Sequence, residues 1–339
     1  MTRARDVADT QDNLGGAVPP FTAGKNKIIN GDFGIWQRGT SFSASGYTAD
    51  RWALVLANTV TISQQTFTPG TAPVSGYEST FFARFNRTAR PTAFDDYFVH
   101  RIEDVRTFAG QTVTLSFWAK SSASTTLSGA YLEHWFGSGG SSSPVYIDST
   151  GPLTLTTSWQ RFTKTIAIPS IAGKTIGTNS FLAVTFAMAN SAGVTGVYDI
   201  WGVQLEAGSV ATPFATASGT IGGELALCQR YYEKSYPYAN LPGSTTSQQG
   251  LVSYQAVSST AINNRCWTPF IVSKRTDSPT ITIYNYNNGA SGTALNESTG
   301  IYAVAIQFQS NRGFNLYPTN GSFSAGQVCN FYYTAESEL

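Results

Sequence analysis

The sequence predicts an all-β protein: a jelly-roll β-sandwich, then a short helix and a second, smaller β-sandwich, with an extended arm at the N-terminus. Many short runs alternate between apolar and polar side chains, which is the period of a half-buried strand. Clusters of Gly, Ser and Pro such as Gly137–Pro144 separate several of these runs. Many short strands with regular turn signals are typical of sandwiches. No alternation of strands and helices suggests a dinucleotide-binding fold.

The length of the chain, 339 residues, predicts two or three domains. We place an arm at residues 1–25, the jelly-roll domain at 26–214, a short helical linker at 215–240 and the smaller sandwich at 241–339. No internal repeat and no low-complexity tract crosses these boundaries.

Charge is sparse in this sequence. Charged residues make up 12% of the chain and the net charge is +1, so hydroxyls and amides are expected to cover the surface. Such a composition suits virion proteins, adhesins or secreted proteins. It argues against nucleic-acid binding, which needs a basic field. Three cysteines, Cys228, Cys266 and Cys329, are too few and too far apart for a disulfide framework.

Residues 1–25 are polar and rich in Gly, and could not order themselves alone. We weigh a floppy leader against an arm that docks onto a neighbouring subunit or another virion protein, and prefer the docking arm. Met1–Thr10 has no apolar region of a signal peptide, and no apolar run reaches the ~18 residues of a membrane span. We therefore expect synthesis without a signal peptide in a host cytoplasm, no membrane insertion, and assembly into a virion.

Two strand-like runs mark the beginning and the end of the jelly-roll domain. Lys27–Asn30 resembles a short strand, and Asn30-Gly31-Asp32 then turns the chain, because Gly accepts φ > 0 without steric cost and Asn tolerates it. Far downstream, Val197–Glu206 is another strand-like run. We expect these two runs to be the first and last strands of the sandwich and to lie side by side, with Asp32 near Asp199.

About ten short strands are expected between residues 26 and 214. In Thr112–Ala119, the side chains of Val113, Leu115 and Phe117 face one way, and Thr, Ser and Trp118 face the other. Similar runs are Thr59–Phe67, Thr80–Arg87, Tyr97–Ile102, Ser158–Ile168 and Phe181–Met188.

The helix candidate is Ile221–Lys234. Its apolar side chains are spaced four, three and four apart and form one stripe, namely Ile221, Leu225, Cys228 and Tyr232. Glu224 near the start and Lys234 near the end suit the helix dipole, and Pro237 would stop the helix. So short a helix must pack on something. It either lies across its own domain or meets copies of itself around a symmetry axis.

The second domain is expected to be a thin β-unit that could bury its second face in an oligomer. Its strand-like runs are Gly250–Val257, Cys266–Val272, Thr280–Asn285, Ile301–Gln309 and Gln327–Thr334. The thin sheet and the short helix both call for partners, which favours a homotrimer.

The sequence contains few residue patterns that are typical of catalytic sites, and we expect that the protein is not an enzyme. His100 and His134 sit in strand-like runs without metal-ligand spacing. Adjacent acids such as Asp95-Asp96 would point to opposite faces of a strand, whereas cleavage of a sugar chain needs two cooperating carboxyl groups.

Aromatic side chains are the main functional lead. Trp118 falls on the polar face of its strand, and Tyr131, Trp135 and Tyr146 flank a Gly/Ser-rich loop. A flat ring offers its π-face to the C–H side of a pyranose, so these four are our candidate glycan-binding residues. Edge packing or subunit contact is the alternative for each of them.

Two sets of motifs resemble a known family. Asn30–Phe33 near the start, together with Tyr198–Ile200 and Val203–Gly208 at the end, resembles the CenC-like carbohydrate-binding modules. Ile35–Gly39 and Tyr47–Trp52 make the chain resemble the versions of this module found in bacteriophage and prophage tail-fibre proteins. The resemblance covers roughly residues 26–214.

The resemblance implies a structural calcium ion clipped between the first and last strands, here by Asp32 and Asp199. Ca²⁺ prefers six to eight hard oxygen ligands. This chain has Gly34 where the family often has an acid, which weakens that site. The alternative is that Asp32 caps its own turn. Leu225–Tyr232 also resembles the junction after the sandwich in phage tail fibres, which favours the trimer.

The function expected from the sequence is therefore that of a bacteriophage tail fibre or similar receptor-binding appendage. It would recognise host surface polysaccharide without cleaving it and dock to other virion proteins through residues 1–25. The alternative is a purely structural virion subunit, a tail adaptor or head-decoration protein, with a vestigial carbohydrate-binding fold.

Overall fold

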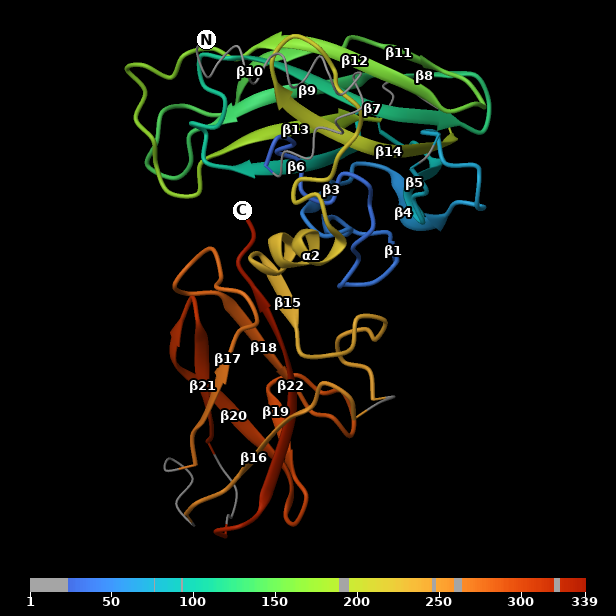
Figure 1. Ribbon diagram of the computed structural model, residues 1–339. Coiled ribbons are helices and arrows are strands. Elements are labelled where there is room, and N and C mark those ends of the chain that lie inside the picture. The colour runs from blue at the N-terminus through green and yellow to red at the C-terminus, as the bar shows by residue number, and fades with distance from the viewer. Residues whose placement is uncertain are drawn as a thin grey trace, which may run out of the picture.

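The computed structural model describes residues 24–75, 77–92, 94–188, 195–245, 248–258, 264–319 and 324–339. The predicted docking arm, residues 1–25, lies almost wholly outside the described residues. Within them the chain forms two β-rich domains, and helix α2 (Ile221–Gln229) lies between the two (Figure 1).

The first domain is a jelly-roll β-sandwich, so the predicted fold class is confirmed. One six-stranded sheet has the order β1 (Ser41–Phe42), β4 (Thr59–Thr66), β5 (Phe81–Ala89), β14 (Gly196–Ala207), β7 (Thr112–Ser121) and β12 (Gln160–Ala167). The other has the order β10 (Val145–Ser149), β9 (Gly129–Trp135), β13 (Phe181–Ala187), β6 (Tyr97–Glu103), β3 (Trp52–Val55) and β2 (Gly46–Tyr47). A small pair, β11 (Leu153–Leu155) with β8 (Thr125–Leu127), completes the domain.

The core lies between these two sheets, because every second side chain of each strand points inward. On β7 the buried inward residues include Val113, Leu115 and Phe117, as the sequence predicted. Phe186 on β13 packs edge-on against Phe117 at a centroid distance of 4.9 Å, which joins the two sheets. One continuous apolar cluster runs from Ile28 to Leu205.

The opening segment is a turn and not a strand. Asn30 adopts a φ of 58°, so the chain reverses at residues 29–32 and the predicted strand Lys27–Asn30 is wrong. The segment nevertheless lies beside β14, as expected. Lys27 N donates to Leu205 O at 3.0 Å, and Val203 N donates to Gly31 O at 2.9 Å.

The side chains of Asn26 and Asn30 anchor this segment. The amide of Asn26 donates to Val203 O at 3.1 Å and its oxygen accepts from Leu205 N at 3.1 Å. The side-chain amide of Asn30 donates to Ile35 O, and the backbone carbonyl oxygen of Asn30 accepts from the indole of Trp52. Both residues are buried with their polar groups paired, which is the condition for burying an amide at little cost.

The helix is shorter than predicted. Thr220 caps its N-terminus by accepting from Gly223 N, and α2 ends at Gln229. The chain then enters β15 (Tyr232–Lys234), which pairs with β22 (Val328–Glu336). Sheet pairing with a distant strand, which sequence periodicity does not report, therefore ends the helix early.

The prediction that the apolar stripe of the helix contacts other copies of the chain is also wrong. Ile221 is 84% exposed and Leu225 is partly buried, whereas Cys228 and Tyr232 are buried within this chain. The stripe does not form one continuous face that a symmetry mate could cover.

The second domain is a smaller β-sandwich around its own core, which runs from Ala256 to Ala335. Its strands follow the order β15, β22, β19 (Thr293–Asn296), β20 (Gly300–Ser310), β21 (Gly313–Pro318) and β17 (Cys266–Pro269), and β16 (Val252–Gln255) and β18 (Thr280–Tyr284) also pair with β22. The sequence did not identify β19 and β21.

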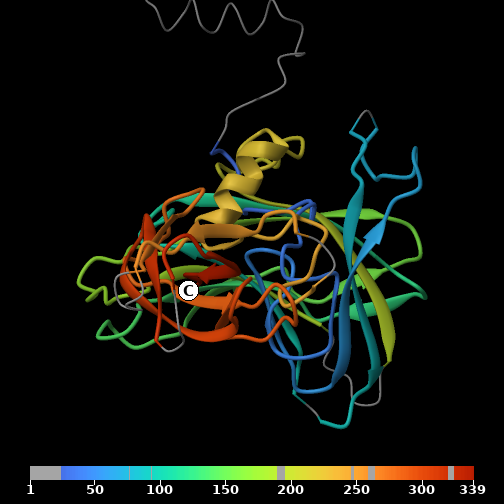
Figure 2. The same cartoon turned by 90° about the horizontal axis from the view of Figure 1, so that it is seen from below.

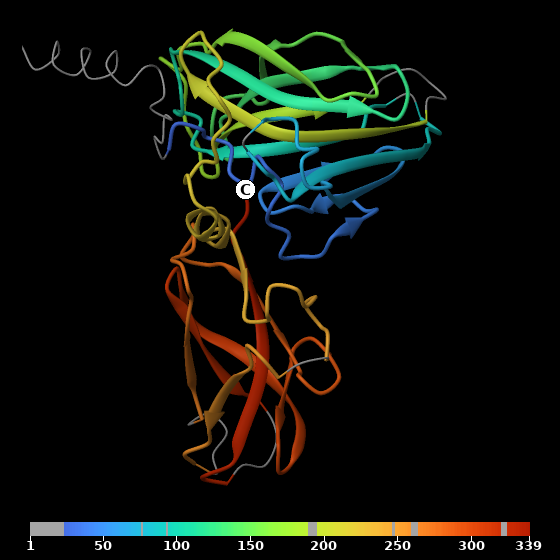
Figure 3. The same cartoon turned by 45° about the vertical axis from the view of Figure 1, so that its right-hand side comes forward.

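A buried ion-pair cluster joins the two domains. Glu338, just beyond β22, contacts two cations of the first domain: Arg38 at 3.1 Å and Arg51. Each guanidinium also lies over a tyrosine ring of the junction, Arg38 over Tyr232 at 3.7 Å and Arg51 over Tyr231 at 3.4 Å. The marked C end lies between the domains in Figures 1 and 3, and Figure 2 shows that the second domain covers only part of the first.

Glycine at position 31 is required by the close approach to β14. A methyl group on Gly31 would overlap the carbonyl oxygen of Val203, which is backbone and cannot move aside. We expect Gly31→Ala to lower the free energy of unfolding by about 1–3 kcal/mol, in the range of other overpacked sites. Urea denaturation measures the change. Gly222→Ala is the matched control, since Gly222 is exposed on α2 with open space around it, and it should raise stability by up to ~1 kcal/mol. Equal effects of the two substitutions would contradict this account.

Asp50 adds a pH dependence to the junction. Burial raises its pKa from 3.8 to about 6, although Arg38 and Gln37 favour the charged form. Between these pH values the folded state holds a proton that the unfolded state releases, so the contribution of Asp50 to stability falls as the pH rises from about 4 to about 6. The variant Asp50→Asn lacks this titrating group. As the pH rises from about 4 to about 6, its free energy of unfolding should therefore increase by about 3 kcal/mol relative to that of wild type, as the size of the pKa shift requires. Parallel stability profiles of the two proteins would refute the prediction.

Candidate functional site

The outer face of the sheet β10-β9-β13-β6-β3-β2 carries the best candidate site. Alternation along β9 puts Leu132 and His134 into the core and turns Tyr131, Glu133 and Trp135 outward. The strand β6 alternates in the same way, whereas on β13 every residue after Phe181 is buried. Figure 1 shows β10, β9, β13 and β6 following one another down the first domain.

The strand register sets four residues in a central row across this face. Arg101 on β6 pairs with Ala183 on β13, Ala183 pairs with Glu133 on β9, and Glu133 pairs with Tyr146 on β10. Ala183 is buried and small, so the row is low at its middle.

Two further rows flank the central row. On one side Phe181 pairs with Trp135, and on the other Val99, Thr185 and Tyr131 are paired across three strands. Trp135 and Tyr131 are four residues apart on one strand, about 13 Å along it. The two rings therefore stand on either side of the central row, which is lowest at Ala183.

This arrangement forms an open groove of about 470 Å³. Its described lining is Val55, Tyr97, Val99, Arg101, Tyr131, Glu133, Trp135, Phe181, Ala183 and Thr185. The groove is thus mostly aromatic and aliphatic with a few polar groups, which is the usual make-up of a small-molecule or glycan site.

The rings of the groove support one another. Trp135 stacks on Phe181 with centroids 5.3 Å apart and planes 16° apart. The ring of Tyr131 lies edge-on to that of Tyr97, with centroids 6.4 Å apart. It is tilted relative to the ring of Tyr146, with centroids 6.2 Å apart. Contacts between neighbouring rings hold each ring in place and leave other parts of it open to a ligand.

Two charged side chains provide polar contacts in the groove. Glu133 accepts from the indole N–H of Trp135 at 3.3 Å, and burial raises the pKa of its carboxyl group. Arg101 lies over the ring of Phe181 at 5.3 Å, donates to Tyr47 Oη at 3.2 Å and donates to Leu339 O. The arginine at the end of the groove is therefore held by the end of the second domain.

Of the four aromatic residues predicted from the sequence, Tyr131 and Trp135 line the groove, and Tyr146 lies beside it against Tyr131. Sequence reasoning missed Tyr97, Phe181, Arg101 and Glu133. The alternation in the runs Tyr97–Ile102 and Phe181–Met188 was visible, but nothing in the sequence says that these strands adjoin β9.

Trp118 does not belong to this site, and that part of the prediction is wrong. It is 7% exposed and lies on the other sheet, in a small apolar cluster with Phe67, Phe82, Trp201 and Phe214. Segments that follow β4 and β14 fold back over the outer face of β7 and cover the ring. A covered ring has no face to offer a sugar.

The predicted calcium pair is also not formed. Asp199 accepts two hydrogen bonds from Arg84, at 2.7 and 2.8 Å, and lies 3.7 Å from Lys120. Asp32 lies on the turn whose backbone meets β14 at Val203, four residues and so about 13 Å further along the strand than Asp199. The residues present therefore do not make the expected site.

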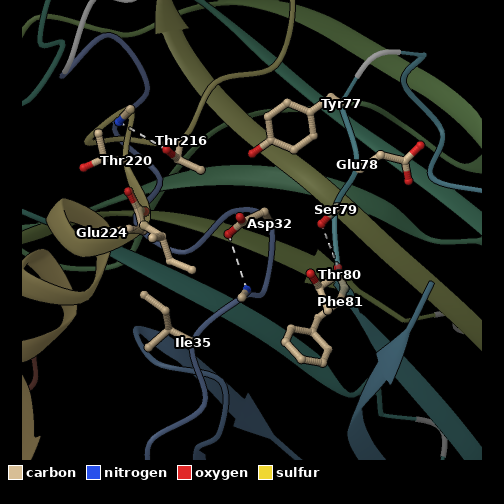
Figure 4. Close-up of a pocket in the computed structure, with 13 residues that line it drawn as sticks. Asp32, Ile35, Tyr77, Glu78, Ser79, Thr80, Phe81, Thr216, Thr220 and Glu224 are labelled. Carbon is tan, nitrogen blue, oxygen red and sulfur yellow. Dashed lines mark hydrogen bonds between the residues drawn. The ribbon is translucent and has the colours of Figure 1, made fainter. Parts of the chain in front are cut away.

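Asp32 instead lines a pocket of about 230 Å³ beside the start of α2 (Figure 4). Glu224 lines it too, and burial raises the pKa of both carboxyl groups. Glu224 accepts from Asn30 N at 2.5 Å and Ser218 N at 3.0 Å, and Asp32 accepts from Gly34 N at 3.3 Å. Backbone N–H groups thus satisfy these acids, in line with the alternative that Asp32 caps its own turn. Among the described residues, no three of His, Cys, Asp and Glu gather to hold a metal ion.

Comparison with family models and with characterised proteins gives no match. Some solved structures are similar. The enzymatically active domain of tailspike protein 4 from bacteriophage CBA120 is 20% identical, with a TM-score of 0.35, over 54% of this chain but only 21% of that one. A CBM4 structure is 17% identical over 53% of this chain and 99% of its own, with a TM-score of 0.35. The N-terminal cellulose-binding domain of β-1,4-glucanase C from Cellulomonas fimi is 16% identical over 51% and 98%, with a TM-score of 0.31.

These similarities are weak, and they say nothing about what this chain binds. In the part of the chain that the structure describes, no helix is both long and apolar enough to cross a lipid bilayer.

The two tryptophans Trp118 and Trp135 should differ in how much stability each loses on substitution. We expect Trp118→Ala to lower the free energy of unfolding by roughly 3–5 kcal/mol, as for other large core residues. Trp135→Ala, on the groove, should cost clearly less. Thermal and urea denaturation of both variants measures the difference. A larger loss for Trp135→Ala would overturn the assignment of the two rings.

Proposed function

We propose that this chain binds a glycan in the groove on the outer face of β9, β13 and β6, and that it does not cleave it. The observation that carries the proposal is an open groove with aromatic rings on both of its sides and the small side chain of Ala183 in its floor. A saccharide lying along the central row would have Trp135 and Phe181 on one side and Tyr131 on the other.

The chemistry of the lining suits a sugar. The C–H faces of a pyranose favour contact with aromatic rings, and its hydroxyl groups both donate and accept hydrogen bonds. Glu133 supplies acceptors and Arg101 supplies donors within the same row. The tyrosine hydroxyls of Tyr97 and Tyr131 can do both. Every part of a sugar ring would thus have a matching group in the groove.

Binding without cleavage agrees with the distribution of acids. Glu133 is the one carboxylate among the described residues that line the groove. Hydrolysis of a glycosidic bond ordinarily uses two carboxyl groups on opposite sides of the bond. With Glu133 tied to the indole of Trp135, its role in this proposal is to fix orientation.

The biological setting of the proposal rests on the sequence motifs. Their resemblance to tail-fibre modules supports a receptor-binding appendage of a bacteriophage, located in the virion and directed at host surface polysaccharide. Docking through residues 1–25, a homotrimer and a calcium ion stay predictions, and a calcium ion would need ligands other than the pair Asp32 and Asp199. The apolar stripe of the helix no longer supports the trimer prediction, because Cys228 and Tyr232 are buried within the chain.

An isolated groove of this kind would bind weakly. Several copies on one particle would convert weak sites into firm attachment, because later contacts form at a high effective concentration. The functional measure is therefore the affinity for a polymer as much as that for a short oligosaccharide.

The proposal is tested with the full chain on an array of bacterial surface polysaccharides, followed by calorimetric titration with an oligosaccharide of the strongest hit. We expect Trp135→Ala and Tyr131→Ala to weaken binding about tenfold each, or about 1.4 kcal/mol. Tyr286→Ala, a partly buried tyrosine in a turn of the second domain, is the matched control and should bind like wild type. Absence of binding to every polysaccharide, or equal losses in all three variants, would reject the proposal and favour a structural virion subunit.

A further inference from the structure

The second domain exposes an aromatic surface of its own on the outer face of β17, β21 and β20. Trp267 on the edge strand β17 pairs with Asn315 on β21, and Asn315 pairs with Gln307 on β20. The alternate residues Thr268, Phe314 and Leu316 are buried on the inner side of these strands. Trp267, Asn315 and Gln307 therefore form one outward row.

Trp267 is the exposed ring of this surface. It is 49% exposed, although an aromatic side chain of this size gains much free energy from burial. Gly313 on β21 lets the ring lie close to the sheet, since a methyl group there would come within 2.8 Å of Trp267 Cζ2. The sheet thus supports the ring from below and leaves its other side open.

The next positions along the strands form a low floor. Tyr317 on β21 pairs with Ala305 on β20, and Ala303 lies two residues further along on the same side. These alanines cannot rise to the height of Trp267 or Tyr317. A flat group resting on the floor would contact the two rings at its edges and the amides of Asn315 and Gln307 beside them.

An arginine completes the surface. Arg265, two residues before Trp267, lies over the ring of Phe308 at 5.4 Å. Phe308 has a φ of 49° at a register shift in β20 and is 62% exposed. The bulge changes the direction of the Phe308 side chain from the one that regular alternation would give it. The ring therefore lies next to the guanidinium of Arg265.

We propose that this surface, defined by Arg265, Trp267, Gln307, Phe308, Asn315 and Tyr317, is a second saccharide-binding site. Rings over a floor of small residues suit the C–H face of a pyranose. The amide of Asn315 provides donors and an acceptor for its hydroxyl groups, and Arg265 provides donors for a hydroxyl or carboxylate oxygen. The site lies in a different domain from the groove.

This inference extends the proposed function from one surface to two on the same chain. Two linked sites would bind a long polysaccharide more tightly than the same number of separate sites, by an amount set by the geometry that links them. A short oligosaccharide, which occupies one site at a time, would not show this gain.

The test compares wild type, Trp267→Ala, the groove variant Trp135→Ala and the double variant on the polysaccharide that binds most strongly in the array. We expect Trp267→Ala to reduce polymer binding about tenfold, with a smaller effect on a short oligosaccharide. Trp267→Tyr keeps a ring and should retain most of the binding. Thermal denaturation verifies that each variant is folded, and Tyr286→Ala serves as the control.

The outcomes separate the two proposals. If Trp135→Ala weakens binding and Trp267→Ala does not, the groove stands and the second site is rejected. If Trp267→Ala weakens binding and Trp135→Ala does not, the second site stands and the groove is rejected. If Trp267→Ala leaves binding intact but changes the mass measured by light scattering, the surface is a contact between copies of the chain, and the saccharide site is rejected.

Discussion

The candidate groove depends on one constraint, the two-residue period of three neighbouring strands. Phe98, Leu132 and Val184 face the core of the sandwich and are completely buried. Their burial stabilises the domain, at up to about 3 kcal/mol for each large apolar side chain. With those residues fixed inward, the residues between them must face outward. A shift of one residue in any strand would exchange the two faces, so the stability of the core also maintains the site.

The same strands connect the groove to the second domain. Arg101 stands at the end of the central row and donates to Leu339 O, while its own carbonyl oxygen accepts from Arg51. Arg51 in turn pairs with Glu338. Buried charges that lose their partners are costly, so these contacts favour a fixed relation between the domains. The last residues of the chain thereby hold one of the polar groups of the groove in place.

The corrections to the sequence interpretation share a cause. Strand alternation predicted an exposed Trp118, and the family resemblance paired Asp199 with Asp32. In the folded chain, segments far away in sequence supply the apolar cluster that covers Trp118 and the guanidinium of Arg84 that holds Asp199. Tyr232 lies outside the helix for the same reason, because it pairs with β22 as part of a strand. Each misassigned residue has a long-range partner that local patterns do not reveal.

The sequence by itself determined the fold class, most of the long strands and two aromatic residues of the groove, Tyr131 and Trp135. Alternation is a local property, and Gly and Asn at turns act through their own backbone, so both can be read along the chain. Only the tertiary structure decided that Arg101, Ala183 and Glu133 form one row, because they come from three strands whose order depends on packing. It also decided which rings stay exposed, since exposure depends on what the rest of the chain covers.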